Sequence, residues 1–212
     1  MSLRFHSESG QAAPLYVAAV VGLLFVALIL LAFGEADIHR NGAQSAADAA
    51  ALAAAKESRS LLEPDLKAHL ADLEYFDSVF NTAFLGGRGD ACGKAFAFAG
   101  RNNATDVRCR PLADGRWGYE VRLKSSKGMS TNSVPGVGGK KAEAQAVAVV
   151  EPRCTFVPDP DSDPDAVPDP DAEAASIGKV RCDGDLEWSV DPEDLTLMPD
   201  VADLFSVRLA ED

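Results

Sequence analysis

The sequence predicts an α+β protein that one N-terminal helix holds in a membrane, and three observations lead to this prediction. Residues 12–34 form an uncharged apolar run, alanine dominates residues 43–55, and hydrophobic and polar residues later alternate, most clearly over residues 117–123. Alanine propagates helix, whereas a period of two is typical of half-buried strands. We therefore expect a transmembrane helix, an Ala-rich stalk helix, and helices packed on a small, mostly antiparallel sheet.

The apolar run follows a short leader, residues 1–11, which we place in the cytoplasm. As a helix, the stretch from Ala12 to Phe33 would span about 33 Å, which matches a hydrocarbon core of about 30 Å. A helix buried in a soluble protein would normally show a polar face, and this run has none. A cleaved signal peptide is the alternative, since Arg4 precedes the run, but the apolar region is long and no clear A-x-A site follows. We predict an uncleaved anchor.

Orientation rests on the rest of the chain, because Arg4 before the helix and Arg40 after it give no charge bias. The four cysteines and the acidic C-terminal part favour export of everything beyond the helix. We therefore expect a single-pass protein of the cytoplasmic membrane, with the N-terminus inside and the C-terminal domain outside.

Residues 35–60 are expected to continue the helix as an Ala-rich stalk, with Gly34 and the Asn41-Gly42 pair as its weak points. Small side chains let helices approach closely, as they do in membranes and fibres. A plain spacer helix explains the same composition, and both interpretations stay open.

Residues 61–156 and 177–212 are predicted to form an extracytoplasmic head. Leucine and phenylalanine recur at spacings of three and four from Leu62 to Phe84, which predicts an amphipathic helix that ends at Gly86-Gly87. Asp90 is expected to cap a second helix. On that helix, one face would carry Cys92, Phe96 and Ala99.

The remaining elements of the head are predicted strands. The strand around residues 107–109 would turn at Asp114-Gly115 into residues 117–123, and residues 180–182 would turn at Asp183-Gly184 into residues 186–190. Residues 142–150 are read as a strand, although their alanines leave a helix open. A last strand is expected over residues 204–209.

Four cysteines lie beyond the apolar run, and no CxxC pair occurs among them. Outside a membrane, two disulfides are the simplest account, with three connectivities available. We favour pairing within the two sets that close short loops, and free buried cysteines remain the alternative. The favoured pairs are Cys92 with Cys109 and Cys154 with Cys182.

Residues 157–176 are rich in Asp and Pro and are predicted to be a disordered linker or loop. Alternating carboxylates within it resemble the ligand spacing of a calcium loop. However, prolines occupy the intervening positions and the glycine and late glutamate of such a loop are missing, so a solvated linker is favoured. The calcium alternative would use Asp159, Asp161, Asp163 and Asp165.

Charge and chemistry exclude two classes of function. The net charge is −13, and residues 155–212 alone hold seventeen acidic against three basic residues, so no basic face for nucleic acid is expected. The three histidines, His6, His39 and His69, stand apart from any nucleophile motif. We expect a protein that is not an enzyme and carries no cofactor.

The segments ESGQAAPLYVAAVVGLLFVALILLAFG and RNGAQSAADAAALAAA, within residues 7–56, resemble the N-terminal region of TadE/TadG-like pilus-assembly proteins. These are pseudopilin-like components of tight-adherence (Flp) type IV pilus systems. The resemblance implies a non-enzymatic, membrane-anchored component that packs its helix in the lipid bilayer and contacts other pilin-like or secretion-apparatus subunits.

The same resemblance implies a processing site for a prepilin peptidase between Gly10 and Gln11. Leu15 stands where mature pilins carry a glutamate, which favours an assembly factor that stays in the membrane over a filament subunit. The competing hypothesis is a membrane-anchored binding or adhesion module, in its calcium-dependent form built on the Asp/Pro segment.

Overall fold

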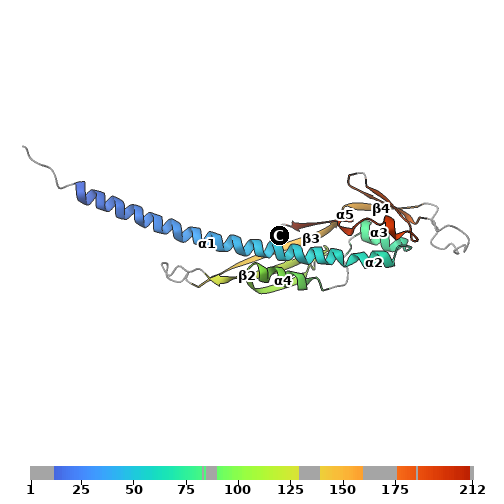
Figure 1. Ribbon diagram of the computed structural model, residues 1–212, viewed down its shortest axis with the longest axis horizontal. Coiled ribbons are helices and arrows are strands. Elements are labelled where there is room, and N and C mark those ends of the chain that lie inside the picture. Colours follow the sequence, from blue (N-terminus) through green and yellow to red (C-terminus); the bar gives the residue numbers. More distant parts are fainter. Residues whose placement is uncertain are drawn as a thin grey trace, which may run out of the picture.

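The longest element is a single helix, of which one half packs in the head and the other half projects from it. The computed structural model describes residues 12–82, 84, 90–128, 139–159, 176–184 and 186–210. Helix α1, Ala12–Ser60, contains 49 residues, which corresponds to a length of about 74 Å. Its N-terminal half projects alone, and its C-terminal half enters the head (Figure 1). Together with the antiparallel strands described below, α1 confirms the predicted α+β class.

The next segment contains two short helices, α2 (Leu62–Ala68) and α3 (Leu73–Asn81), so the single helix predicted from Leu62 to Phe84 is wrong. The chain leaves the helical path at His69, whose N–H donates to the Leu66 carbonyl at 3.2 Å. Helix α3 then starts anew, because the Asp72 carboxylate accepts the Tyr75 N–H and caps it. The predicted stop at Gly86-Gly87 lies outside the described residues.

Helix α4, Cys92–Arg101, differs from its prediction in cap and face. Ala91 occupies the N-cap position, without a side-chain cap, so Asp90 does not cap the helix. Ala95 and Ala99 are buried, whereas Phe96 is 47% exposed. The alanine face of α4 is buried because α4 packs against α1, and only small side chains fit where two helices approach closely.

The larger sheet has four antiparallel strands in the order β1-β2-β3-β7 and confirms the strands predicted in these regions. Strand β3 is formed where a helix had remained open. The turn from β1 to β2 contains Gly115 at φ 84°, a backbone conformation that glycine adopts without strain. The strands are β1 (Ala104–Pro111), β2 (Gly118–Gly128), β3 (Lys141–Pro152) and β7 (Phe205–Ala210).

A second sheet of three antiparallel strands contains one strand that was not predicted from the sequence. Strand β4 (Cys154–Pro158) pairs with β5 (Gly178–Cys182), which pairs with β6 (Glu187–Val190). Pro158 lies opposite Gly178, so the chain leaves and re-enters the sheet at neighbouring positions. The Asp/Pro segment is therefore the connection of a β-hairpin. A 3₁₀ turn and the short helix α5 (Val201–Leu204) lead from β6 to β7.

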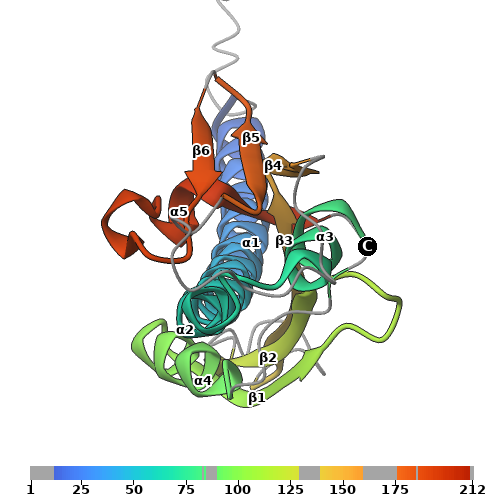
Figure 2. The same cartoon turned by 90° about the vertical axis from the view of Figure 1, so that its right-hand side faces the viewer.

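The core surrounds the C-terminal half of α1. Viewed along the long axis, α1 lies between α4 with the larger sheet and the strands of the smaller sheet (Figure 2). An aromatic cluster fills the space between α3, β4, β6 and β7, with ring centroids 5.3 to 6.1 Å apart. It consists of Phe76, Phe80, Phe156, Trp188, Phe205 and Trp117.

Enlarging a buried alanine of α1 should destabilise the head. Ala54 is fully buried, and Ala54→Leu is expected to cost about 1–3 kcal/mol of unfolding free energy through overpacking. Urea unfolding of the full chain in detergent, followed by the fluorescence of the buried Trp117 and Trp188, measures the change. Ser45→Leu is the matched control, because it places the same side chain at an exposed position of the same helix. Equal midpoints for the two variants would contradict the packing described.

Candidate functional site

The first half of α1 is an apolar surface that the head leaves uncovered. The window Ala13–Leu30 has a mean hydropathy of 2.6, and none of it is buried. Leu15 is 74% exposed and Phe25 is 63% exposed, and large aliphatic side chains are uncovered on every side of the helix. At 1.5 Å per residue these 18 residues cover about 27 Å, close to the hydrocarbon thickness of a bilayer. By length and composition, this is a single candidate membrane-spanning helix within the described residues.

The second half of the same helix presents alanines to the head. Helix α1 packs against β2, β3, β7 and α4. Its buried face contains almost only alanine, and the stalk predicted for residues 35–60 thus passes into the core. The buried alanines are Ala43, Ala46, Ala47, Ala50, Ala51, Ala53, Ala54 and Ala55. Their small size lets the strands approach the helix backbone, so the Ala-rich segment is a packing surface inside the head.

Two side chains near the C-terminal end of α1 fasten it to the larger sheet. Ser58 is buried, and its Oγ accepts the Trp117 Nε1–H at 2.8 Å and the Tyr119 hydroxyl at 3.4 Å. Arg59 donates through Nη1 to the Phe205 carbonyl at 3.0 Å. These polar contacts fix where along the helix the strands lie, a position that a face of alanines alone specifies weakly.

Two disulfides add covalent links within the head. Cys92 of α4 is joined to Cys109 of β1, and Cys154 of β4 to Cys182 of β5, the two pairs favoured on loop length. The first ties α4 to the edge strand of the larger sheet. The second joins directly opposed residues of the smaller sheet, next to the hairpin that carries the Asp/Pro segment.

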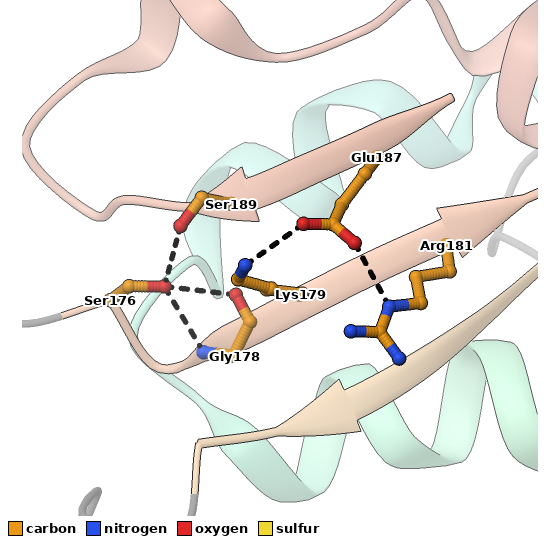
Figure 3. A network of polar contacts seen from close by, with 6 residues as sticks. All are labelled: Ser176, Gly178, Lys179, Arg181, Glu187 and Ser189. Carbon is orange, nitrogen blue, oxygen red and sulfur yellow. Dashed lines mark hydrogen bonds and ion pairs between the residues drawn. The ribbon is translucent and has the colours of Figure 1, made fainter. Parts of the chain in front are cut away.

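The base of that hairpin is held by a small polar network on β5 and β6 (Figure 3). Glu187 accepts from Lys179 Nζ at 2.8 Å and from Arg181 Nε at 2.9 Å, and these bonds, first that of Lys179, hold the pKa of the Glu187 carboxyl below its usual range. Ser176 Oγ donates to the Gly178 carbonyl and accepts from Ser189 Oγ. The chain is thus fixed where it returns from the Asp/Pro segment.

Of the four aspartates named as possible calcium ligands, the structure describes Asp159. Asp159 donates its N–H to the Ile177 carbonyl at 3.1 Å, across the base of the hairpin. Asp161, Asp163 and Asp165 lie outside the described residues, as do Gly10 and Gln11 of the predicted processing site. Within the described part of the chain, no group of three or more His, Cys, Asp or Glu side chains could hold a metal ion.

The outer face of the larger sheet carries paired charges. Glu120 accepts from Arg110 at 2.6 Å and from Arg122, and these hydrogen bonds, first that of Arg110, lower the pKa of its carboxyl. Lys124 pairs with Glu143 at 2.9 Å. A hollow of about 610 Å³ lies over these strands and is lined largely by charged side chains. The arrangement stabilises a solvated sheet face, and its pairs of opposite charge do not resemble a nucleophile held by a base.

The two histidines that the structure describes, His69 and His39, lie far apart from each other in the sequence. His69 contacts the Asp65 carbonyl through Nδ1 at 2.8 Å and stacks on Tyr75 at 4.3 Å between ring centroids. Burial, reinforced by Asp65 and Asp72, raises the pKa of Tyr75 to about 12. His39 lies on α1 between the two halves of the helix, and His6 falls in the part that the structure leaves undescribed.

Comparison with known proteins identifies the segment built around α1. The model of a protein family described as putative Flp pilus-assembly TadE/G-like matches residues 10–57. No curated protein and no solved structure matches the chain. The match confirms the resemblance seen in the sequence and covers both halves of α1, the uncovered apolar half and nearly all of the half that packs in the head.

Removing the hydroxyl of Ser58 should weaken the attachment of α1 to the sheet. Ser58→Ala leaves the buried Trp117 indole N–H without its acceptor, and an unpaired buried donor costs about 1–3 kcal/mol. Thermal unfolding monitored by circular dichroism should show a lower midpoint than for the unmodified chain. Ser60→Ala serves as control, because its hydroxyl donates to the Lys56 carbonyl on the exposed side of the same helix. Similar midpoints for both variants would argue against the buried contact.

Proposed function

We propose that this chain, which carries a TadE/G-like Flp pilus-assembly domain, is a non-enzymatic, membrane-anchored component of a pilus-assembly apparatus. One observation supports the proposal above the others. A single helix joins an uncovered apolar half to an alanine half that lies in the core of the head. Such a helix holds a folded domain at a fixed position beside a bilayer, where neighbouring subunits with similar helices can pack against it.

The apolar half of α1 is the proposed contact with other subunits. In a membrane, helices associate through van der Waals packing of their side chains, since lipid tails are as apolar as the side chains themselves. The surface from Ala13 to Leu30 is free on all sides for such packing. We assign the N-terminus to the cytoplasm and the head to the outer side, which agrees with the two disulfides, since these persist in oxidising compartments.

The chain is proposed to stay in the membrane as an assembly factor. Leu15, at the position where the resemblance would require a glutamate, is an apolar and exposed residue of the anchor. An aliphatic side chain at this depth is favourable in lipid, and it offers no charge to pair with a neighbouring terminal amine. A permanent anchor agrees with both properties.

A matched pair of chains tests the assembly role. The full chain should recover pilin-like or pilus-apparatus subunits from native membranes after crosslinking. A variant in which the residues of Ala13–Leu30 are reordered, with composition unchanged, should remain in the membrane fraction and lose these partners, because the packing surface is destroyed and the hydropathy is kept. Equal recovery by both chains would contradict a role for the helix surface, and no pilus subunit with either chain would contradict the assembly function.

Mass spectrometry of the mature N-terminus tests whether the chain keeps its leader. An assembly factor that is not processed should begin at Met1 or Ser2, and a chain that begins at Gln11 would contradict the permanent leader.

The second candidate is a binding or adhesion module, favoured by the position of the acidic segment at a hairpin between β4 and β5. If the segment binds calcium, thermal unfolding of the full chain should shift upward at millimolar calcium, because a ligand that binds only the folded state stabilises it. Asp159→Asn with Asp161→Asn should remove the shift, and magnesium at equal ionic strength is the control. An unchanged midpoint with calcium would contradict the metal-dependent form of this function.

A further inference from the structure

The end of the head nearest the apolar half of α1 carries a group of lysines. Strands β2 and β3 run alongside α1 and end where they pass into their connection (Figure 1), with Gly128 paired to Lys141. Lys127 lies beside this pair in β2, and Lys140 directly precedes β3. The three lysines are far from α1 in the sequence, and the pairing of the two strands brings them to the same end of the sheet. Lys127 lies on the side of α1, and Lys141 contacts Thr105 of β1.

A hollow of about 240 Å³ shows how close this end lies to the membrane helix. It is lined by Ile38 and His39 of α1 together with Asn103, Ser126 and Lys127 of the head. Lys127 thus lines the same hollow as Ile38, which lies five residues beyond Phe33, the last residue of the apolar run. Five residues of helix correspond to about 8 Å, and the headgroup layer on each side of a bilayer is about 5–7 Å thick.

We propose that this lysine group, formed by Lys127, Lys140 and Lys141, binds the anionic headgroups of phospholipids around the anchor. The proposal rests on the membrane anchorage proposed above. Lysine suits the task, because a flexible stem carries its ammonium group to a phosphate several ångströms away. Basic groups close to a membrane are attracted to anionic lipid, and each strengthens binding by roughly fivefold.

The surrounding charges favour lipid over a contact within the head. Lys127, Lys140 and Lys141 form no ion pair with the described acidic residues, and Lys141 Nζ donates to the neutral Thr105 hydroxyl, at 3.3 Å. Lys124, three residues before Lys127, is already paired with Glu143. Asp37 of α1 is an exposed acidic residue near this level, and exposed Arg40 lies about one turn further on.

Two further features agree with a bilayer at this place. Ile38 is 72% exposed, and an apolar side chain at the outer edge of the headgroups gains from partial insertion. The acidic excess of the chain belongs to residues 155–212, whose strands β4 to β6 lie at the opposite end of the molecule (Figure 1). The described strands of this acidic part therefore lie away from the end of the head that carries the lysine group, where Asp37 is an exposed acidic residue.

Hydrogen exchange of the full chain in lipid nanodiscs tests the proposal. In discs of phosphatidylcholine with one third phosphatidylglycerol, peptides that cover residues 125–128 and 139–143 should exchange several-fold more slowly than in discs of phosphatidylcholine alone. Raising the salt to 0.5 M should reduce this difference, because the Debye length falls to about 4 Å. Peptides from residues 178–190 report whether the head stays folded and should not change.

Charge reversal supplies the matched comparison. The variant Lys127→Glu, Lys140→Glu, Lys141→Glu should lose the lipid-dependent protection, whereas Lys56→Glu, Lys67→Glu, Lys94→Glu, with the same change of charge elsewhere on the head, should keep it. Incorporation into discs with equal exchange in both lipids would overturn the proposed headgroup contact alone, and so would protection that survives in the first variant. Failure of the unmodified chain to enter discs would overturn the membrane anchor and the headgroup contact together.

Discussion

The architecture of the head depends on the close approach of other elements to the alanine face of α1. An alanine adds only one methyl group to the helix surface, so α4 and the strands of the larger sheet can lie near the helix backbone. Alanine itself contributes little apolar area, and most of the hydrophobic surface comes from partners such as Val121 and Leu123, which are fully or almost fully buried. The helix is therefore the centre of the core, and the head cannot fold in this form without it.

The two halves of α1 are adapted to different environments within one element. Leucine, valine and phenylalanine cover the first half on all sides, whereas small residues line one face of the second half and polar residues the other. In water the first half would expose a large apolar surface, and proteins rarely tolerate such surfaces without a partner or a membrane. The change of composition along the helix thus separates the candidate membrane-spanning half of α1 from the half that packs in the head.

The order of apolar and polar residues predicted those helices and strands whose burial follows a regular period in the sequence. The apolar run and the alternation in β2 arise from burial of one helix or one strand face, and both were recognised from residue order. The face of α4 was not, because a hydrophobic pattern favours Phe96 as the buried residue, whereas the close approach of α1 leaves room only for Ala95 and Ala99. Strand β4 was missed since its last residues merge with the Asp/Pro segment and its pairing with β5 is not local.

The lysine group proposed to contact phospholipids could not be predicted from the sequence for the same reason. Lys127 and Lys140 flank a Gly- and Ser-rich stretch without periodicity, and nothing in their sequence neighbourhood relates them to residue 38. Only the pairing of β2 with β3 brings them to the same end of the sheet, and the packing of the sheet on α1 places Lys127 beside the helix. In contrast, the disulfide pairs could be favoured from sequence, because short loops close at a lower entropic cost than long ones.

The continuity of α1 from Ala12 to Ser60 has a mechanical consequence. The head cannot rotate independently of the candidate membrane-spanning segment, because both belong to the helix on which the sheets are built. Transmembrane helices tilt by about 20° on average, and over the roughly 39 Å of α1 beyond Gly34 such a tilt moves the far end sideways by about 13 Å. Rotation of the helix about its axis turns the head through the same angle. In the proposed membrane setting, bilayer thickness and neighbouring helices would therefore set the direction in which the head points.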